Sequence, residues 1–108
     1  IAQQFDTVCI CGHSHVQGVF KRNDQLDWEF VQPIVGERYH LQDAQKTIVT
    51  AGSVGQLRDG DSRAFFLTID GDAVSFHRIA YKVTATVEKI RSMPEINNMH
   101  GERLLVGR

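Results

Sequence analysis

The sequence has few cysteines and no long apolar run, and both scarcities limit what the protein can be. Its two cysteines, Cys9 and Cys11, are two residues apart, a spacing at which a disulfide would strain an extended strand. A disulfide framework is therefore disfavoured, and reduced cysteines favour a cytoplasmic protein. No apolar stretch approaches the roughly 20 residues that a membrane-spanning helix needs. Residues 1–6 also lack the basic and apolar segments of a signal peptide.

An excess of positive charge is lacking as well. Twelve Lys and Arg residues stand against thirteen Asp and Glu residues, and the longest basic run is Lys21-Arg22. Binding to the phosphate backbone of a nucleic acid requires a basic stripe, which this sequence does not contain. We therefore expect neither a nucleic-acid nor a membrane partner. A length of 108 residues fits one domain or a part of one.

The apolar pattern predicts a series of short strands. Strands are expected at residues 6–11, 18–22, 28–34, 46–50, 63–69 and 73–80, with residues 36–45 irregular. Asp70-Gly71-Asp72 separates the last two runs, and Asp-Gly between two strands is a strong hairpin signal. Pro33 should end its strand or place it at a sheet edge, because proline has no N–H for the ladder.

The period of the pattern changes after residue 81. Apolar residues then recur at spacings of four, three and three, which is one face of a helix: Val83, Val87, Ile90 and Met93. Thr84 is a suitable N-cap. Pro94 interrupts this helix, and residues 95–106 form a second short helix or an irregular tail. The sequence thus predicts a mixed α/β (α+β) fold, with an antiparallel-rich sheet and a C-terminal helix.

Gly12-His13-Ser14-His15 is the best candidate for chemistry. Two histidines at i and i+2, directly after a strand, can present both imidazoles to one site. Imidazole is a common neutral metal ligand near pH 7. Gly12 would let the backbone approach a metal where a Cβ would obstruct it. The alternative is a pair of solvent-facing loop histidines, because short histidine pairs are frequent by accident.

Two segments resemble motifs of the calcineurin-like metallophosphoesterase superfamily. Residues 6–15 are similar to its last motif, Gly-His-X-His after a hydrophobic strand. Residues 52–61, Gly-Ser-Val-Gly-Gln-Leu-Arg-Asp-Gly-Asp, resemble the Asn-Pro-Gly-Ser-Val-Gly-Gln-Pro-Arg-Asp-Gly-Asp loop of one bacterial and archaeal branch. Thr50-Ala51 replace the Asn-Pro of that loop, and Leu57 replaces its second proline. The order of the following hairpin and helix also fits, so the resemblance covers nearly the whole chain.

The resemblance implies a fold and a chemistry. These proteins fold as a four-layer α-β-β-α sandwich with two divalent metal ions at the ends of the central strands, where they hydrolyse phosphate esters. By this resemblance His13 binds one ion and His15 binds the other. Mixed nitrogen and oxygen ligation suits Mn, Fe, Ni or Zn.

The other ligand motifs of the superfamily are absent from the sequence. Asp-X-His and Gly-Asn-His do not occur, and Gly60-Asp61 and Gly71-Asp72 follow the Gly-His-X-His motif instead of preceding it. We therefore interpret residues 1–108 as the C-terminal portion of a single metallophosphoesterase domain, the C-terminal half of the sandwich. Such a fragment should bind metal weakly, contain no catalytic residue and be inactive alone.

A non-catalytic binding or assembly module derived from such a half-domain is the alternative. In both cases, the surface left by the missing half should be apolar, which favours self-association.

Three further candidates are weaker. Cys11, His13 and His15 could hold a single zinc ion, but a structural zinc normally has four protein ligands and no fourth lies nearby in the sequence. Arg58 could meet a substrate phosphate, although an ion pair with Asp59 or Asp61 is the favoured interpretation. A surface or packing role is favoured for His77.

Overall fold

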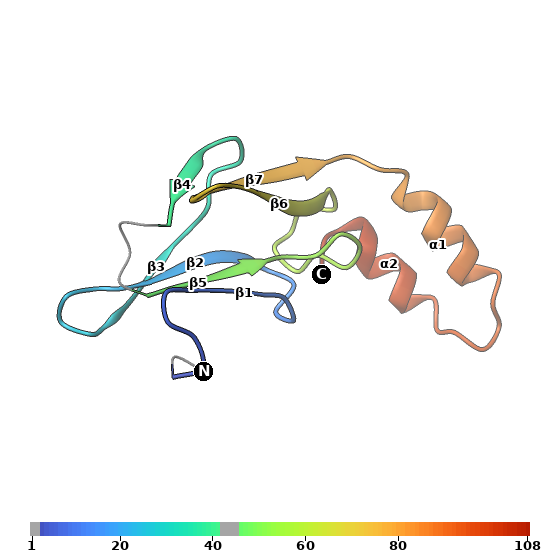
Figure 1. The fold of residues 1–108 in the computed structure, drawn as a ribbon. Helices are drawn as coiled ribbons and strands as arrows, with labels where there is room; N and C mark the ends of the chain where they lie inside the picture. The colour runs from blue at the N-terminus through green and yellow to red at the C-terminus, as the bar shows by residue number, and fades with distance from the viewer. Residues whose placement is uncertain (1–2, 42–45) are drawn as a thin grey trace.

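The described chain consists of seven strands and two helices. The structure is a computed structural model and describes residues 3–41 and 46–108. The strands are β1 (Val8–Cys11), β2 (Gln17–Arg22), β3 (Trp28–Val31), β4 (Arg38–His40), β5 (Thr47–Ala51), β6 (Ala64–Asp70) and β7 (Ala73–Ile79), and the helices are α1 (Val83–Arg91) and α2 (Met99–Leu105). They form a four-stranded sheet of order β1-β5-β2-β3, a three-stranded sheet of order β4-β7-β6, and a helical hairpin (Figure 1). The predicted mixed α/β class, antiparallel-rich with a C-terminal helix, is confirmed.

The strand predictions were right in position but wrong in two details. β3 ends at Val31 instead of residue 34, although the edge position expected of the strand before Pro33 is confirmed. Residues 36–45 were expected to be irregular, yet β4 lies within them; residues 42–45 of that segment are outside the described residues. β4 is held by antiparallel pairing with β7, where Tyr39 stands opposite Val74. Tertiary pairing of this kind outweighs a weak local strand propensity.

The helix prediction was right in its start but wrong in its cap. Lys82 is the N-cap of α1 and makes no side-chain capping hydrogen bond, so Thr84 is not the cap. The helix ends at Arg91, which leaves Met93 outside it. The second helix, α2, occupies part of the segment beyond Pro94.

The hydrophobic core lies between the two sheets. Alternate residues of a strand face opposite sides of a sheet, and Val19 of β2 stands opposite Val49 of β5 in the register. Both side chains are fully buried, and they pack with Phe65, Val74 and Phe76 of the other sheet. Each such side chain stabilises the fold by about 1.5–3 kcal/mol relative to an exposed one. The core therefore fixes the distance between the sheets.

The Asp-Gly hairpin is confirmed. β6 and β7 pair in an unbroken antiparallel register from Ala64 opposite Ile79 to Asp70 opposite Ala73. Gly71 takes a φ of 59° in the turn, a left-handed conformation that glycine adopts without steric cost. The hairpin sets the position of Phe65 and Phe66 at its open end.

The outer face of the four-stranded sheet is apolar and uncovered by the described residues. In the register, Cys9, Ile48, Phe20 and Phe30 lie across the four strands on the side away from the core. Phe30 is 53% exposed. Strands that are apolar on both faces are typical of a sheet covered on both sides. Here only the core-facing side is covered.

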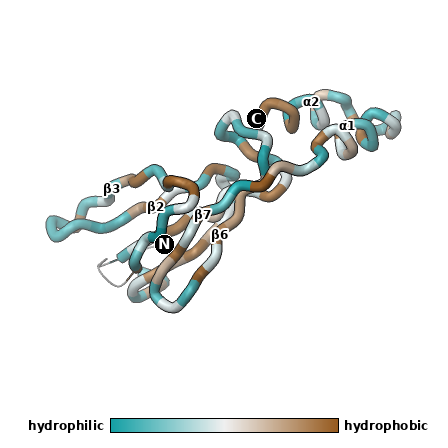
Figure 2. Tube along the Cα trace, turned by 90° about the horizontal axis from the view of Figure 1, so that it is seen from above, coloured by the Kyte–Doolittle hydropathy of each residue, from teal (hydrophilic) through white to brown (hydrophobic). Residues whose placement is uncertain are grey.

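The helical hairpin projects from one end of the sheets, whereas the polar tip of the β2–β3 hairpin lies at the other (Figures 1 and 2). The molecule measures 52 × 26 × 19 Å, and its radius of gyration is 16.5 Å. A compact domain of this length would have a radius of about 13 Å. The chain is therefore elongated. Of the described residues, neither helix is long and apolar enough to cross a membrane.

Candidate functional site

The two sequence motifs meet because β1 and β5 are parallel neighbours. Cys11 at the end of β1 stands opposite Thr50 near the end of β5. The carboxyl ends of parallel strands lie at the same sheet edge, which is where open α/β sheets bind their ligands. The histidine loop (residues 12–16) and the glycine-rich loop (residues 52–61) both leave from this edge. They are joined by a hydrogen bond of 3.2 Å from the Arg58 backbone N–H to the His15 carbonyl oxygen.

The histidine loop has an unusual backbone conformation. His13 and His15 have φ angles of 81° and 61°, in the left-handed region that residues with a Cβ rarely occupy. Strained residues of this kind cluster at ligand sites, where the surrounding structure enforces them. Gly12 does not have a positive φ, and its Cβ position is open among the described atoms. The close approach of Gly12 to a metal stays a prediction, and the left-handed conformations of this loop belong to the two histidines.

Thr50 helps to hold the histidine loop in place. Its hydroxyl donates a hydrogen bond of 2.8 Å to the carbonyl oxygen of Val16. Thr50-Ala51 is where the sequence departs from the Asn-Pro of the resembled loop. In this chain a side-chain hydrogen bond at that position ties β5 directly to the residue after His15.

His15 presents a buried nitrogen with no hydrogen-bond partner. The ring is half-buried, and its Nδ1 has no partner among the described residues. Leaving a buried polar atom unpaired is costly, so such atoms are normally matched by a ligand or a donor. His13 is exposed. The half-buried imidazole and the exposed one fit two ligands at the rim of a metal site.

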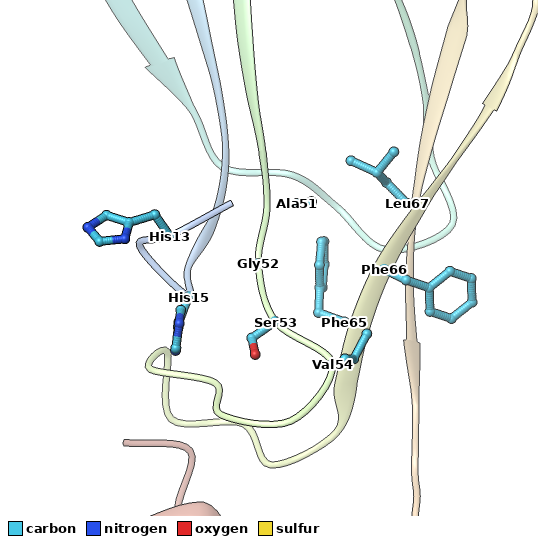
Figure 3. Close-up of a pocket in the computed structure, with 9 residues that line it drawn as sticks. All are labelled: His13, His15, Ala51, Gly52, Ser53, Val54, Phe65, Phe66 and Leu67. Atoms are coloured by element: carbon cyan, nitrogen blue, oxygen red, sulfur yellow. The ribbon is translucent and has the colours of Figure 1, made fainter. Parts of the chain in front are cut away.

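A pocket of about 530 Å³ adjoins both histidines (Figure 3). Its lining consists of His13, His15, Ala51, Gly52, Ser53, Val54, Phe65, Phe66 and Leu67. In Figure 3 the histidines lie on one side of the segment 51–53, and Phe65 and Leu67 lie on the other. A Cβ on Gly52 would stand 2.8 Å from the Phe65 ring, and Gly52 has a φ of 69°. Glycine at this position therefore allows the loop to pass close to the aromatic wall.

The described residues do not contain a complete metal site. No group of three or more His, Cys, Asp or Glu side chains among residues 3–41 and 46–108 lies close enough to hold an ion. The alternative zinc site of Cys11, His13 and His15 is therefore not formed. Both cysteines are free thiols, and burial, assisted by the neighbouring Cys9, raises the pKa of Cys11. A raised pKa disfavours the thiolate that a metal requires.

The carboxylates of the glycine-rich loop have partners other than the predicted one. Asp61 pairs with Arg63 at 2.7 Å, and Asp59 accepts a hydrogen bond from Arg78. The expected bridge from Arg58 to Asp59 or Asp61 was wrong. Burial by itself raises the pKa of Asp59, but hydrogen bonds from Arg78, Gln17 and the Asp61 N–H outweigh it and hold the pKa below its ordinary value.

Arg78 was not among the residues predicted from the sequence. It follows Val74 and Phe76 at the spacing of core-facing residues in β7, so a charged residue on that face was the available signal. His77 points to the other face, where it stacks on Phe66 at 5.0 Å and shares a hydrogen bond with Thr68. Of the surface or packing role expected for His77, packing is what the structure shows.

Comparison with known proteins finds one similar curated protein and similar solved structures. No protein-family model matches the chain. The chain is 31% identical over 102 residues to an uncharacterised protein of Methanocaldococcus jannaschii, a match that covers 90% of this chain and 38% of that protein. The crystal structure of a metallophosphoesterase from Sphaerobacter thermophilus is similar with a TM-score of 0.85 and 30% identity, over 96% of this chain and 44% of that one. The chain spans less than half of the length of each. It has the fold of part of a metallophosphoesterase, which supports the superfamily indicated by the two motifs.

Proposed function

We propose that this chain supplies part of the dinuclear metal centre of a metal-dependent phosphoesterase, a phosphatase or phosphodiesterase. His13 and His15 are the ligands, each to a different ion. The observation that carries this proposal is the buried Nδ1 of His15, which has no partner among the described residues and lies at the sheet edge where the two motif loops meet. Manganese, iron, nickel and zinc all suit imidazole combined with oxygen ligands.

The residues of the chain have distinct tasks in this proposal. A pair of bound divalent ions supplies an acidified water and neutralises charge on the phosphoryl oxygens. His15 offers a ring nitrogen from a half-buried imidazole as a metal ligand. The exposed imidazole of His13 is the second ligand from this loop. The Ser53 hydroxyl accepts hydrogen bonds from the N–H groups of Gly55 and Gln56 and so shapes the glycine-rich loop beside them. The exposed Arg58 is available for a phosphate oxygen.

Two histidines cannot hold two ions. The further ligands belong, in this proposal, to the part of a metallophosphoesterase that the chain does not span, which is more than half of the Sphaerobacter thermophilus protein. In this proposal the chain corresponds to the C-terminal half of one domain. Alone it binds metal weakly and has no activity.

The test replaces the matching segment of the Sphaerobacter thermophilus protein by this chain and assays chromogenic phosphate esters with added Mn²⁺. We expect metal-dependent turnover that is lost in His15→Ala and retained in the matched control His100→Ala, which changes an exposed histidine of α2. Equal turnover in the two variants would contradict the proposal. Metal-dependent turnover by the isolated chain that is lost in His15→Ala would contradict the proposal that the further metal ligands lie outside this chain.

The apolar outer face of the four-stranded sheet favours a second proposal, in which the isolated chain associates with a second copy of itself. Phe20, Ile48 and Phe30 lie side by side in the register of that face, and Trp28 follows on the same side. Monomers rarely expose large continuous apolar patches. Association between copies through this face would be its role if the chain is an assembly module. The two free thiols support a cytoplasmic setting for either function.

A further inference from the structure

Arg78 is a buried cation at the end of the core. Its side chain is only 6% exposed, and it donates to the Asp59 carboxylate, whose side chain is 13% exposed. The Arg78 Nε also lies 3.6 Å from Asp61, and the guanidinium lies 5.1 Å from the centre of the Phe65 ring. A buried charge needs a paired and hydrogen-bonded partner, and removing the partner leaves it uncompensated. The position of Asp59 is therefore coupled to Arg78.

Asp59 in turn holds the segment that begins at His15. The Gln17 side chain, which is buried, lies beside the Asp59 carboxylate and helps to lower its pKa. The residue before Asp59 is Arg58, and its backbone N–H donates to the His15 carbonyl oxygen. Residues 58 and 59, which are adjacent in the glycine-rich loop, thus lie against both ends of residues 15–17, and Arg58 holds His15 by a hydrogen bond. The hydrogen bond from the Arg58 N–H therefore acts on His15 directly, whereas His13 lies two residues before His15 in the sequence.

We propose that Arg78 is a positioning residue for His15, acting through Asp59. It fixes residues 58–59, and the Arg58 N–H of that pair holds the carbonyl oxygen of His15, so the strained backbone of His15 keeps its left-handed conformation. Arg63 offers a contrast, because it pairs with Asp61 in the same loop but is 54% exposed. The metal readout below rests on the proposed function, whereas the hydrogen-exchange readout does not.

The experiment uses the full chain with Co²⁺ as the probe, followed by NMR of the histidine rings. Arg78→Gln removes the charge, Arg78→Lys keeps the charge but loses the planar fork, and Arg63→Gln is the matched control. The dissociation constant is measured separately at His15 and His13, so His13 is an internal reference. Hydrogen exchange of the Arg58 amide reports the bond to the His15 carbonyl without any metal.

For Arg78→Gln we expect the Co²⁺ dissociation constant at His15 to rise about 3–10-fold relative to that at His13, near the low end of effects for residues behind a metal ligand. Exchange of the Arg58 amide should accelerate about tenfold, as expected for a locally opened loop. Arg78→Lys should lie between wild type and Arg78→Gln, and Arg63→Gln should leave both readouts within about twofold of wild type. A merely structural role of Arg78 would lower the stability of the fold without changing the ratio of the Co²⁺ dissociation constants at His15 and His13.

The inference is overturned if a folded Arg78 variant shows wild-type hydrogen exchange of the Arg58 amide and an unchanged ratio of the two dissociation constants. Equal effects of Arg63→Gln would overturn it too. If Arg78→Gln does not fold, Arg78→Lys decides the question with the same readouts. If wild-type His15 does not respond to Co²⁺ at all, the proposed function fails, and the exchange of the Arg58 amide alone decides whether Arg78 positions His15.

Discussion

Gly107→Ala should detach the end of the chain from the glycine-rich loop. Gly107 has a φ of 66°, and a Cβ at this position would stand 2.6 Å from the backbone nitrogen of Asp61 and 2.8 Å from its carbonyl oxygen. The carbonyl oxygen of Gly107 also accepts a 3.0 Å hydrogen bond from the Gly60 N–H. The left-handed conformation costs a residue with a Cβ about 1–2 kcal/mol. Overpacking against a backbone that cannot rotate away adds about 1–3 kcal/mol.

Gly71→Ala is the matched control for this substitution. Gly71 has a φ of 59°, close to that of Gly107, but no described atom lies within 4 Å of its Cβ position. It should therefore lose only the conformational term of about 1–2 kcal/mol, against about 2–5 kcal/mol for Gly107→Ala. Urea unfolding followed by circular dichroism measures both free energies of unfolding. Equal losses in the two variants would refute the packing of the chain end against Asp61.

Three further predictions concern the loop, the core and the outer face. The Arg63 side chain holds the pKa of Asp61 at about 2 against an ordinary 3.8. The pairing of Asp61 with Arg63 therefore stabilises the fold fully above pH 3.8, and this stabilisation is lost as the pH falls through about 2. Arg63→Gln should raise that pKa, and an unchanged carboxyl ¹³C titration would contradict the pairing. Leu57→Ala, at a buried core position, should destabilise by about 2–5 kcal/mol in urea unfolding, whereas a loss below about 1 kcal/mol would place Leu57 outside the core. Phe30→Lys should weaken self-association in sedimentation, and a monodisperse monomer in wild type at high concentration would contradict that association.

Local patterns predicted most of the fold. Alternating apolar residues and the Asp-Gly turn predicted β6 and β7 because their pairing is local and set by the turn. The helix from Val83 followed from its apolar spacing. β4 was missed because its pairing with β7 is tertiary, and the polar residues around Tyr39 give no strand period.

The candidate site was predictable in its residues but not in its supports. His13 and His15 could be singled out from the two motifs, and the structure places both loops at one sheet edge. The ion pair of Asp59 with Arg78 joins residues 19 positions apart, and no local pattern specifies it. Arg58 and Asp59 are adjacent in the sequence, which made the wrong bridge the simplest expectation.

The central claim is that His13 and His15 bind metal, and ¹⁵N NMR of the imidazole rings during titration with Zn²⁺ tests it most directly. The chain contains five histidines, of which the others serve as internal controls: His40, His77 and His100. We predict weak binding in which the ring nitrogens of His13 and His15 shift first, including the unpartnered Nδ1 of His15. Shifts of equal size at all five histidines, or none at His15, would contradict the claim.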